Sequence, residues 1–156
     1  RSSGPRRFDS AEQEAFLNLW RAYDRLRLLE DEVFRPFDLT PQQYNALRLL
    51  RAAHPGTLAT LDLASRLVSR APDITRMLDK LQQRGLITRD RQAENRRVVR
   101  VCIAEAGIAL LDELHDKLQA CHQQQLGHLP RRKLKELIAL LREVREPHED
   151  DTGHWQ

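Results

Sequence analysis

The chain has 156 residues, of which 40% are hydrophobic and 31% are charged, and its formal net charge is +3. This length predicts one domain with a buried core and a highly charged surface. No run approaches the roughly 18 apolar residues that a membrane span needs, and two cysteines are too few for a disulfide framework. We therefore expect a cytoplasmic protein without membrane contact, and we assign no structure to residues 1–7.

Two helices are predicted in the first third of the chain. Ser10 or Asp9, with two glutamates close behind, indicates a helix start, and apolar residues then recur every three or four positions as far as Pro36. Thr40 as N-cap and Pro41 as first helical residue begin the second helix, which stops at a His-Pro-Gly sequence.

Two shorter helices and a hairpin follow. Thr60 is predicted to cap a helix over Leu61–Leu67, and a further helix over Pro72–Arg84 ends on Gly85. Segments 86–89 and 98–103 are rich in β-branched residues and flank the polar segment 90–97, which predicts two strands with an exposed tip. The expected fold is mainly α with a small two- to three-stranded β wing, a winged helix-turn-helix.

The last third predicts two more helices. A long helix is expected to begin after Gly107, with Leu111, Leu114 and Leu118 forming a narrow seam suited to another helix. The final helix carries an apolar stripe before Pro147. In the sequence, the winged segment therefore lies between the first predicted helix and the last two.

Positive charge is concentrated in the winged segment. Between Arg66 and Arg100 there are ten Lys or Arg and four acids, a local charge of +6 that leaves −3 for the remainder. This asymmetry is typical of a phosphate-contacting face, although a solvated helix surface would explain any single arginine.

The N-terminal half of the helix after the turn is the predicted DNA-reading element. A major groove about 12 Å wide admits one α-helix. Arg76 is the best candidate for a guanine contact, and Asp73 either stabilises the helix start or accepts a hydrogen bond from a cytosine amino group. Arg96 and Arg97 at the hairpin tip would enter the minor groove, with Arg89 beside them on phosphate. The predicted DNA-binding residues are Arg70, Ala71, Pro72, Asp73, Thr75, Arg76, Lys80, Arg89, Arg96 and Arg97.

Seven of the eight aromatic residues lie in the first 44 positions. Core packing of a long helix is one interpretation, and an aromatic effector pocket is the other. The candidate pocket residues are Phe16, Trp20, Tyr23, Tyr44 and His54.

No catalytic or metal motif is recognised. The chain lacks a glycine-rich phosphate loop, an HExxH sequence and a nucleophile elbow, so we expect neither an enzyme nor a cofactor. His115 and His122 are seven residues apart, which is less suited to one metal ion than a spacing of four, and no metal site is predicted. Cys102 and Cys121 are interpreted as buried thiols rather than sensors.

A family resemblance is carried by the segments 63–67 (LASRL), 74–81 (ITRMLDKL), 84–87 (RGLI) and 95–101 (NRRVVRV). Together they resemble the MarR family of bacterial transcription regulators. Within this pattern Asn95 stands where the family commonly has Asp, and Ala104 stands where Thr usually caps the fifth helix.

The resemblance implies a homodimer that binds palindromic double-stranded DNA. Residues 40–103 would form the DNA-binding lobe, residues 9–36 and 105–146 the dimerisation helices, all within a single unit over 1–156. It also implies a repressor that a small, often aromatic acid releases from DNA. The alternative is a winged-helix protein-interaction module that does not bind DNA.

Overall fold

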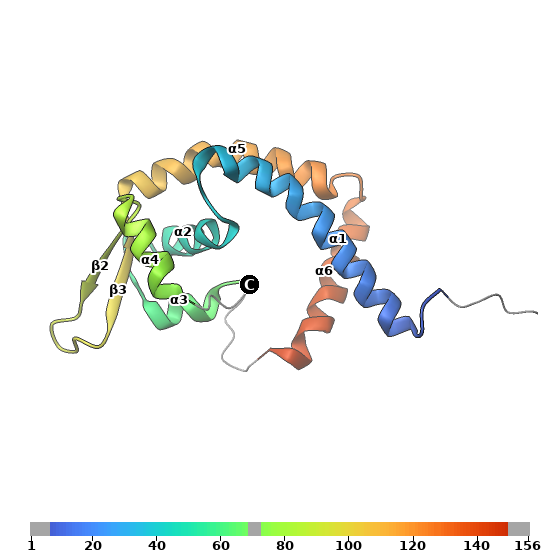
Figure 1. Cartoon of the computed structure of the whole chain (residues 1–156), viewed down its shortest axis with the longest axis horizontal. Helices are drawn as coiled ribbons and strands as arrows, with labels where there is room; N and C mark the ends of the chain where they lie inside the picture. The colour runs from blue at the N-terminus through green and yellow to red at the C-terminus, as the bar shows by residue number, and fades with distance from the viewer. Residues whose placement is uncertain (1–6, 69–72, 150–156) are drawn as a thin grey trace, which may run out of the picture.

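The computed structural model describes residues 7–68 and 73–149. Helices α1 and α5 lie side by side as an arch, with a lobe of α2, α3, α4 and the sheet under one end and α6 at the other (Figure 1). This mainly helical architecture with a small antiparallel sheet confirms the predicted fold class. The elements are, in order, α1 (Ala11–Phe34), η1 (Arg35–Phe37), α2 (Pro41–Ala53), β1 (Leu58–Ala59), α3 (Thr60–Arg66), α4 (Ile74–Gln83), β2 (Ile87–Arg91), β3 (Val99–Ile103), α5 (Glu105–Leu126), α6 (Arg131–Arg145) and η2 (Glu146–His148).

Side-chain caps set the starts of the first two helices. The Oγ of Ser10 accepts a hydrogen bond from the backbone N of Gln13 at 3.0 Å. Thr40 and Gln43 form a capping box, in which each side chain accepts from the other residue's backbone N, at 3.1 Å and 3.0 Å. Both predicted helix starts are confirmed.

The predicted starts of the two short helices are wrong by one or two residues. Ala59 is the N-cap of α3, and Thr60 lies inside the helix because its Oγ1 donates to the Val99 carbonyl on β3 at 3.3 Å. Helix α4 begins at Ile74 with Asp73 as its N-cap, two residues after the predicted start at Pro72. Pro72 itself lies outside the described residues.

Helix α5 begins at Glu105 rather than after Gly107, which lies in its first turn. A Cβ on Gly107 would sit 2.4 Å from the Leu86 carbonyl oxygen and 2.7 Å from Cγ1 of Ile103. The same Leu86 oxygen accepts from the backbone N of Ala104 at 2.9 Å. The glycine is therefore a close-packing position against the end of the lobe and not a helix break.

The sheet has the order β1-β3-β2, with both pairs antiparallel. Ile87 pairs with Ile103 and Arg91 with Val99, so the hairpin strands are in full register over five residues. Strand β1 adds only the pairs that Leu58 and Ala59 make with β3. Two residues are too short a segment to produce a strand pattern in the sequence.

One hydrophobic core joins the lobe to the arch. Its members come from all six elements of the lobe, from the end of α1 and from α5. They include Phe34, Leu47, Leu50, Leu63, Leu78, Leu81, Ile87, Val101, Leu111, Leu114 and Leu118. The seam predicted on α5 is therefore filled within the chain, where α5 packs on α1 and α2.

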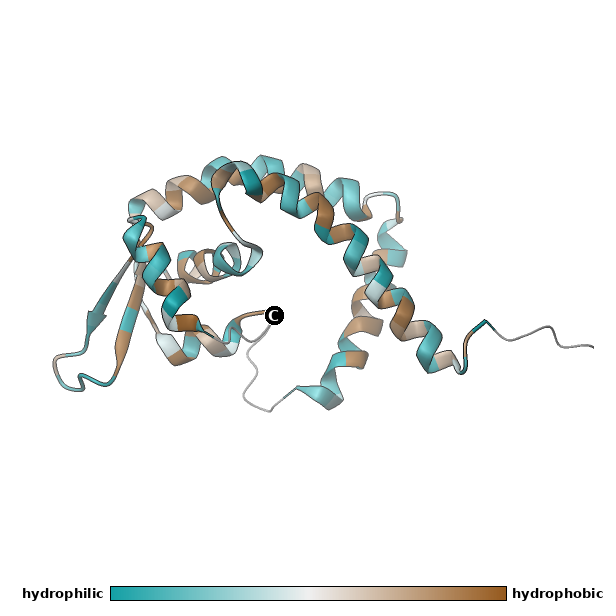
Figure 2. Cartoon of the chain, viewed as in Figure 1, coloured by the Kyte–Doolittle hydropathy of each residue, from teal (hydrophilic) through white to brown (hydrophobic). Residues whose placement is uncertain are grey.

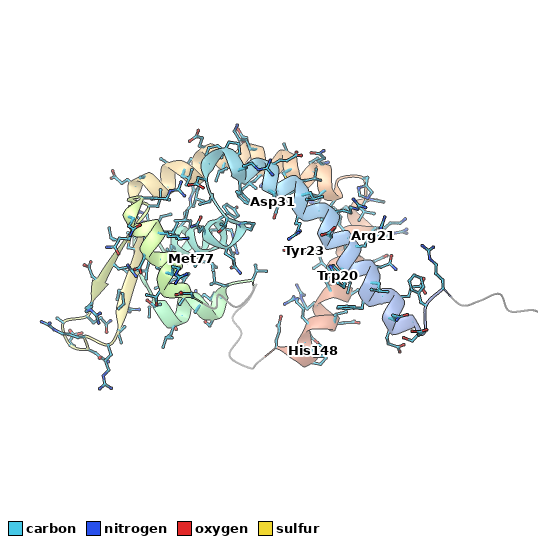
Figure 3. All side chains as sticks on the ribbon, viewed as in Figure 1. Trp20, Arg21, Tyr23, Asp31, Met77 and His148 are labelled. Carbon is cyan, nitrogen blue, oxygen red and sulfur yellow. The ribbon has the colours of Figure 1, made fainter. Side chains whose placement is uncertain are left out.

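Other apolar side chains of α1 and α6 remain exposed. Phe16, Trp20 and Tyr23 are 63%, 62% and 67% exposed, so the interpretation of these three as core residues is wrong for the single chain. Figure 2 shows apolar residues along both helices, and Figure 3 labels Trp20 and Tyr23 where α1 crosses α6 in that view. On α6, Ile138 and Val144 are exposed as well. No helix in residues 7–68 or 73–149 is long and apolar enough to cross a bilayer.

Candidate nucleic-acid interface

Helix α4 has one buried face and one outward face. Leu78 and Leu81 are buried in the core, with Ile74 and Met77 packed against it. The helical repeat therefore directs a polar set outward, as the periodicity requires. That set consists of the exposed Thr75, Arg76, Lys80 and Gln83 and the partly exposed Asp79.

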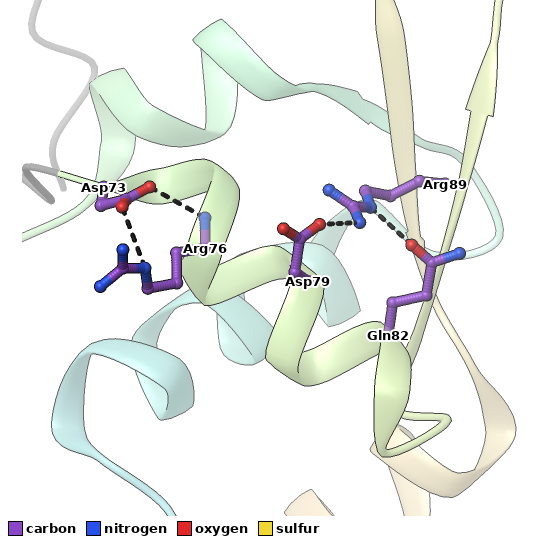
Figure 4. A network of polar contacts seen from close by, with 5 residues as sticks. All are labelled: Asp73, Arg76, Asp79, Gln82 and Arg89. Carbon is purple, nitrogen blue, oxygen red and sulfur yellow. Dashed lines mark hydrogen bonds and ion pairs between the residues drawn. The ribbon is translucent and has the colours of Figure 1, made fainter.

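Asp73 organises the start of α4. Its Oδ1 accepts from the backbone N of Arg76 at 3.0 Å, and its Oδ2 lies 3.3 Å from Nε of the same residue (Figure 4). An acid at this position also interacts favourably with the positive N-terminal end of the helix dipole. Of the two roles open for Asp73, the helix-stabilising one is present in the structure. Arg76 remains 75% exposed on its side chain.

Arg89 joins the wing to α4. From strand β2 its Nε donates to Oε1 of Gln82 at 2.7 Å, and its Nη2 forms a hydrogen bond and ion pair with Oδ1 of Asp79 (Figure 4). The Arg89 side chain is only 20% exposed. This predicted phosphate-contact residue is thus directed at the helix, and its contacts hold the hairpin against α4.

The wing tip is shaped by Asn95 and Arg91. Oδ1 of Asn95 accepts from the backbone N of Arg97 at 3.1 Å, and the Asn95 carbonyl accepts from the N of Val98 at 3.0 Å. Nη1 of Arg91 donates to the Arg96 carbonyl at 2.8 Å. An amide oxygen therefore supplies the turn contact at this position, and Arg96 and Arg97 are exposed.

Besides Asp73 and Arg89, the other eight of the ten predicted DNA-binding residues fall into three groups. Thr75, Arg76 and Lys80 share the outward face of α4, whereas Arg96 and Arg97 lie at the wing tip. Residues 70–72, three of the predicted contacts, lie outside the described residues. Sequence reasoning missed Asp79 and Gln82 as partners of Arg89. The signal available in the sequence was Asp79, an acid on the outward face of an otherwise basic helix, where an arginine partner is expected.

The five candidate effector residues do not share one cavity. Phe16, Trp20 and Tyr23 lie along α1, and His54 is the exposed C-cap of α2. Tyr44 packs on Phe34 with ring centroids 5.2 Å apart. Burial raises the pKa of the Tyr44 hydroxyl, although the nearby Arg48 acts in the opposite direction.

A cavity of about 160 Å³ adjoins Tyr44 between α2 and α5. It is lined by Tyr44, Arg48, Arg51, Leu111, His115, Leu118, Gln119 and His122. Arg51 Nη2 forms a 2.6 Å ion pair with Oδ1 of Asp112. The lining thus combines aromatic and aliphatic carbon with cationic and titratable groups.

The hydrogen bonds of Gln125 determine the tautomer of His122. Nε2 of Gln125 donates to the Leu26 carbonyl at 2.9 Å, so Oε1 of the same amide is the group 2.9 Å from Nδ1 of His122. An amide oxygen only accepts, so Nδ1 must carry the hydrogen. Nε2 of the neutral ring is then an acceptor.

The two cysteines differ in burial. Cys121 is buried and Cys102 is half-buried, so the expectation of two buried thiols holds fully for Cys121. Burial raises the pKa of the Cys121 thiol, which disfavours the reactive thiolate. Across the described residues, no three His, Cys, Asp or Glu are grouped as metal ligands.

Comparison with known proteins places this geometry in a family. Residues 39–99 match the model of the MarR family. The chain is 54% identical to a MarR transcription factor from Planctomyces limnophilus, with 87% of this chain and 98% of that one covered and a TM-score of 0.70. It is 26% identical to a mutant MarR from E. coli in complex with operator DNA, covering 81% and 89% with a TM-score of 0.73. BpsR of Bordetella bronchiseptica, whose DNA binding is regulated by 6-hydroxynicotinic acid, is 25% identical over 90% and 97% with a TM-score of 0.77.

Proposed function

This chain belongs to the MarR family of transcription regulators, and from that premise we propose that it binds palindromic double-stranded DNA as a homodimer. Helix α4 enters the major groove, and the wing tip enters the adjacent minor groove. A small acidic effector lowers the affinity for DNA, so the protein acts as a repressor in the cytoplasm.

One observation carries the DNA-binding proposal: the outward face of α4 and the wing are built as one unit. Thr75, Arg76 and Lys80 are exposed on α4, and Arg89 ties the wing strand to the same helix through Asp79. Arg76 has the planar fork that matches guanine O6 and N7. In this proposal Arg89 supports the wing, and Arg96 and Arg97 contact DNA.

The exposed apolar surface of α1 and α6 supports the dimer. Within residues 7–68 and 73–149, no residue of α6 is buried. Its apolar residues Ile138, Leu140 and Val144 are exposed. Trp20 and Tyr23 add aromatic surface on α1. A protein rarely leaves such a surface in water, and a second copy of the chain covers it.

The cavity beside Tyr44 supports an acidic effector. Arg48 offers a guanidinium group that pairs with a carboxylate, Arg51 adds positive charge while it holds Asp112, and Tyr44 offers an aromatic surface. BpsR, a relative regulated by 6-hydroxynicotinic acid, provides a precedent for such a ligand class. The cavity lies between α2 of the lobe and α5 of the arch, where a ligand can alter the position of the lobe.

Selection from a random DNA library, followed by anisotropy titration of the enriched sequence, tests the proposal. We expect a two-fold symmetric sequence with half-sites about one helical turn apart, roughly 34–36 Å. The affinity should decrease steeply with salt because several phosphates are neutralised. No enrichment, or binding that does not depend on salt, would contradict the proposal.

A further inference from the structure

Arg84 connects the end of α4 to the turn between η1 and α2. Its Nη1 donates to the Asp38 carbonyl at 2.6 Å and its Nη2 to the Phe37 carbonyl at 2.8 Å. Arg84 is the C-cap of α4, and Gly85 follows it with a φ of 71°. Both terminal nitrogens of the guanidinium are thus engaged by a segment 46 and 47 residues away in the chain.

The turn that receives Arg84 is itself held by backbone hydrogen bonds. The N of Asp38 donates to the Arg35 carbonyl at 3.1 Å, and the N of Leu39 donates to the Phe34 carbonyl at 3.4 Å. Asp38 has a φ of 48°, in the left-handed region that Asp tolerates better than most residues. Two adjacent carbonyls are therefore presented in a defined geometry, which suits the fork of an arginine.

The same turn contacts the long helix α5 from another side. Nζ of Lys117 lies 5.7 Å from the centroid of the Phe37 ring. Phe34, the last residue of α1, is buried in the core beneath the turn. The η1 segment thus joins three helices: α1 leads into it, α5 contacts its aromatic ring, and α4 contacts its carbonyls through Arg84.

A groove of about 630 Å³ lies beside this joint, between the end of α1 and α4. Lys80, Gln83 and Arg84 line it from α4, and Asp31 and Arg35 line it from the α1 side. In the part of the chain that the structure describes, the hydrogen bonds that join α4 to the η1 turn both come from Arg84. Beyond the hydrophobic core that Phe34 shares with Leu78 and Leu81, Arg84 therefore supplies the polar link that these residues show between α4 and the α1 side across the groove.

We propose that Arg84 is a positioning residue that sets the angle of α4 relative to α1, and through it the separation of the two reading helices in a dimer. This inference rests on the proposed function, in which a homodimer reads two half-sites. A dimer measures the distance between half-sites with its recognition helices. If the joint loosens, each lobe turns more freely on the arch and tolerates half-sites at other separations.

The test is a spacing series on the selected palindrome. The spacer between the half-sites is shortened and lengthened by single base pairs, and the affinity of each DNA is measured for the wild type and for Arg84→Ala. We expect the variant to lose roughly tenfold in affinity at the preferred spacing and much less at the others, since two charge-assisted hydrogen bonds are removed. The affinity of Arg84→Ala should therefore differ little between spacer lengths.

Lys80→Ala is the matched control, because Lys80 lines the same groove from the same helix but is exposed on the face of α4 that the proposal places against DNA, and it does not contact the η1 turn in the hydrogen bonds described above. It should weaken binding by a similar factor at every spacing and keep the preference. Arg84→Lys retains the charge without the fork and should have an intermediate preference. It also provides the comparison if Arg84→Ala does not fold.

The outcomes separate this inference from the function on which it rests. A wild type that binds no DNA would overturn the proposed function and this inference with it. A wild type with a clear spacing preference that both Arg84 variants retain would overturn this inference alone. Equal losses at all spacings with a lowered melting temperature would also overturn it, because Arg84 would then only stabilise the fold.

Discussion

The carboxylate of Asp73 contacts Arg76 twice, through the backbone N at 3.0 Å and through Nε of the guanidinium at 3.3 Å. The first contact caps α4, and the second restrains the side chain that is best suited to read a base. A restrained side chain loses less rotamer freedom on binding. The two terminal nitrogens of Arg76 are not used in this ion pair and can form the bidentate contact.

Replacement of Arg76 by alanine should cost about 1–3 kcal/mol of binding free energy and relax the base preference at one position of each half-site. Arg76→Lys is the informative companion, because lysine keeps the charge but lacks the planar fork. It should preserve the salt dependence and still lose the preference. Anisotropy titrations against a set of single-base substitutions measure both effects. An unchanged preference in the alanine variant would contradict the assignment.

We expect the effects of replacing Asp79 and Arg89 on DNA binding to be non-additive in a double-mutant cycle. Arg89→Ala releases the wing and also leaves Asp79 unpaired on the outward face of α4, where it repels phosphate. Adding Asp79→Ala removes that repulsion, so the double variant should bind more tightly than Arg89→Ala alone. We expect a coupling of about 0.5–3 kcal/mol between the two positions. Additive losses in the titrations would show that the pair does not connect wing and helix during binding.

The exposed apolar residues of α1 and α6 predict the dimer interface. Trp20→Glu and Ile138→Glu each place a charge on this surface, and both variants should sediment as monomers and bind the palindrome poorly. Thr57→Glu, on an exposed position of the lobe, adds the same charge elsewhere and should remain dimeric. Sedimentation velocity distinguishes the outcomes. If Trp20→Glu and Ile138→Glu both stay dimeric, the interface lies on another face.

We expect the free energy of unfolding to depend on pH through the carboxyl group of Glu30. Burial raises the pKa of its carboxyl group, and the nearby His122 only partly opposes this effect. A raised pKa means that the folded state binds the proton more tightly, so the group reduces stability as the pH rises above the ordinary carboxyl range of about 4.3. Glu30→Gln should therefore be more stable than the wild type at pH 7, with the difference vanishing below about pH 4. Urea unfolding at matched protein concentration measures the difference, and a less stable variant at pH 7 would contradict the burial argument.

The helix pattern and the family could be predicted from the sequence because both depend on local features. Helix starts and ends are marked locally by residues such as Thr40, Pro41 and Gly85, whose effect on the helix boundary does not depend on tertiary contacts. The predicted start of α4 was wrong because Asp73 is its local cap, and the predicted start of α3 was wrong because a distant contact holds the predicted cap residue. Thr60 is drawn into α3 while its hydroxyl contacts Val99, which is 39 residues away.

The roles of individual arginines could not be predicted for the same reason. Arg84, Arg89 and Arg91 look alike in a basic sequence, yet one contacts the η1 turn, one contacts α4 and one contacts the wing tip. Periodicity also identified the apolar stripe of α1 without showing that, within residues 7–68 and 73–149, Phe16, Trp20 and Tyr23 remain exposed. Whether a stripe is core or interface depends on which helices meet, and that is a property of the tertiary structure.

Gly107 determines how closely the arch approaches the lobe. Because no side chain separates the first turn of α5 from the Leu86 carbonyl, the backbone of the long helix lies directly on the residue that precedes β2. A side chain at position 107 would collide with Leu86 and Ile103, so it would push the start of α5 away from the hairpin. The distance between the lobe and this end of the arch therefore depends on the absence of a side chain at one residue.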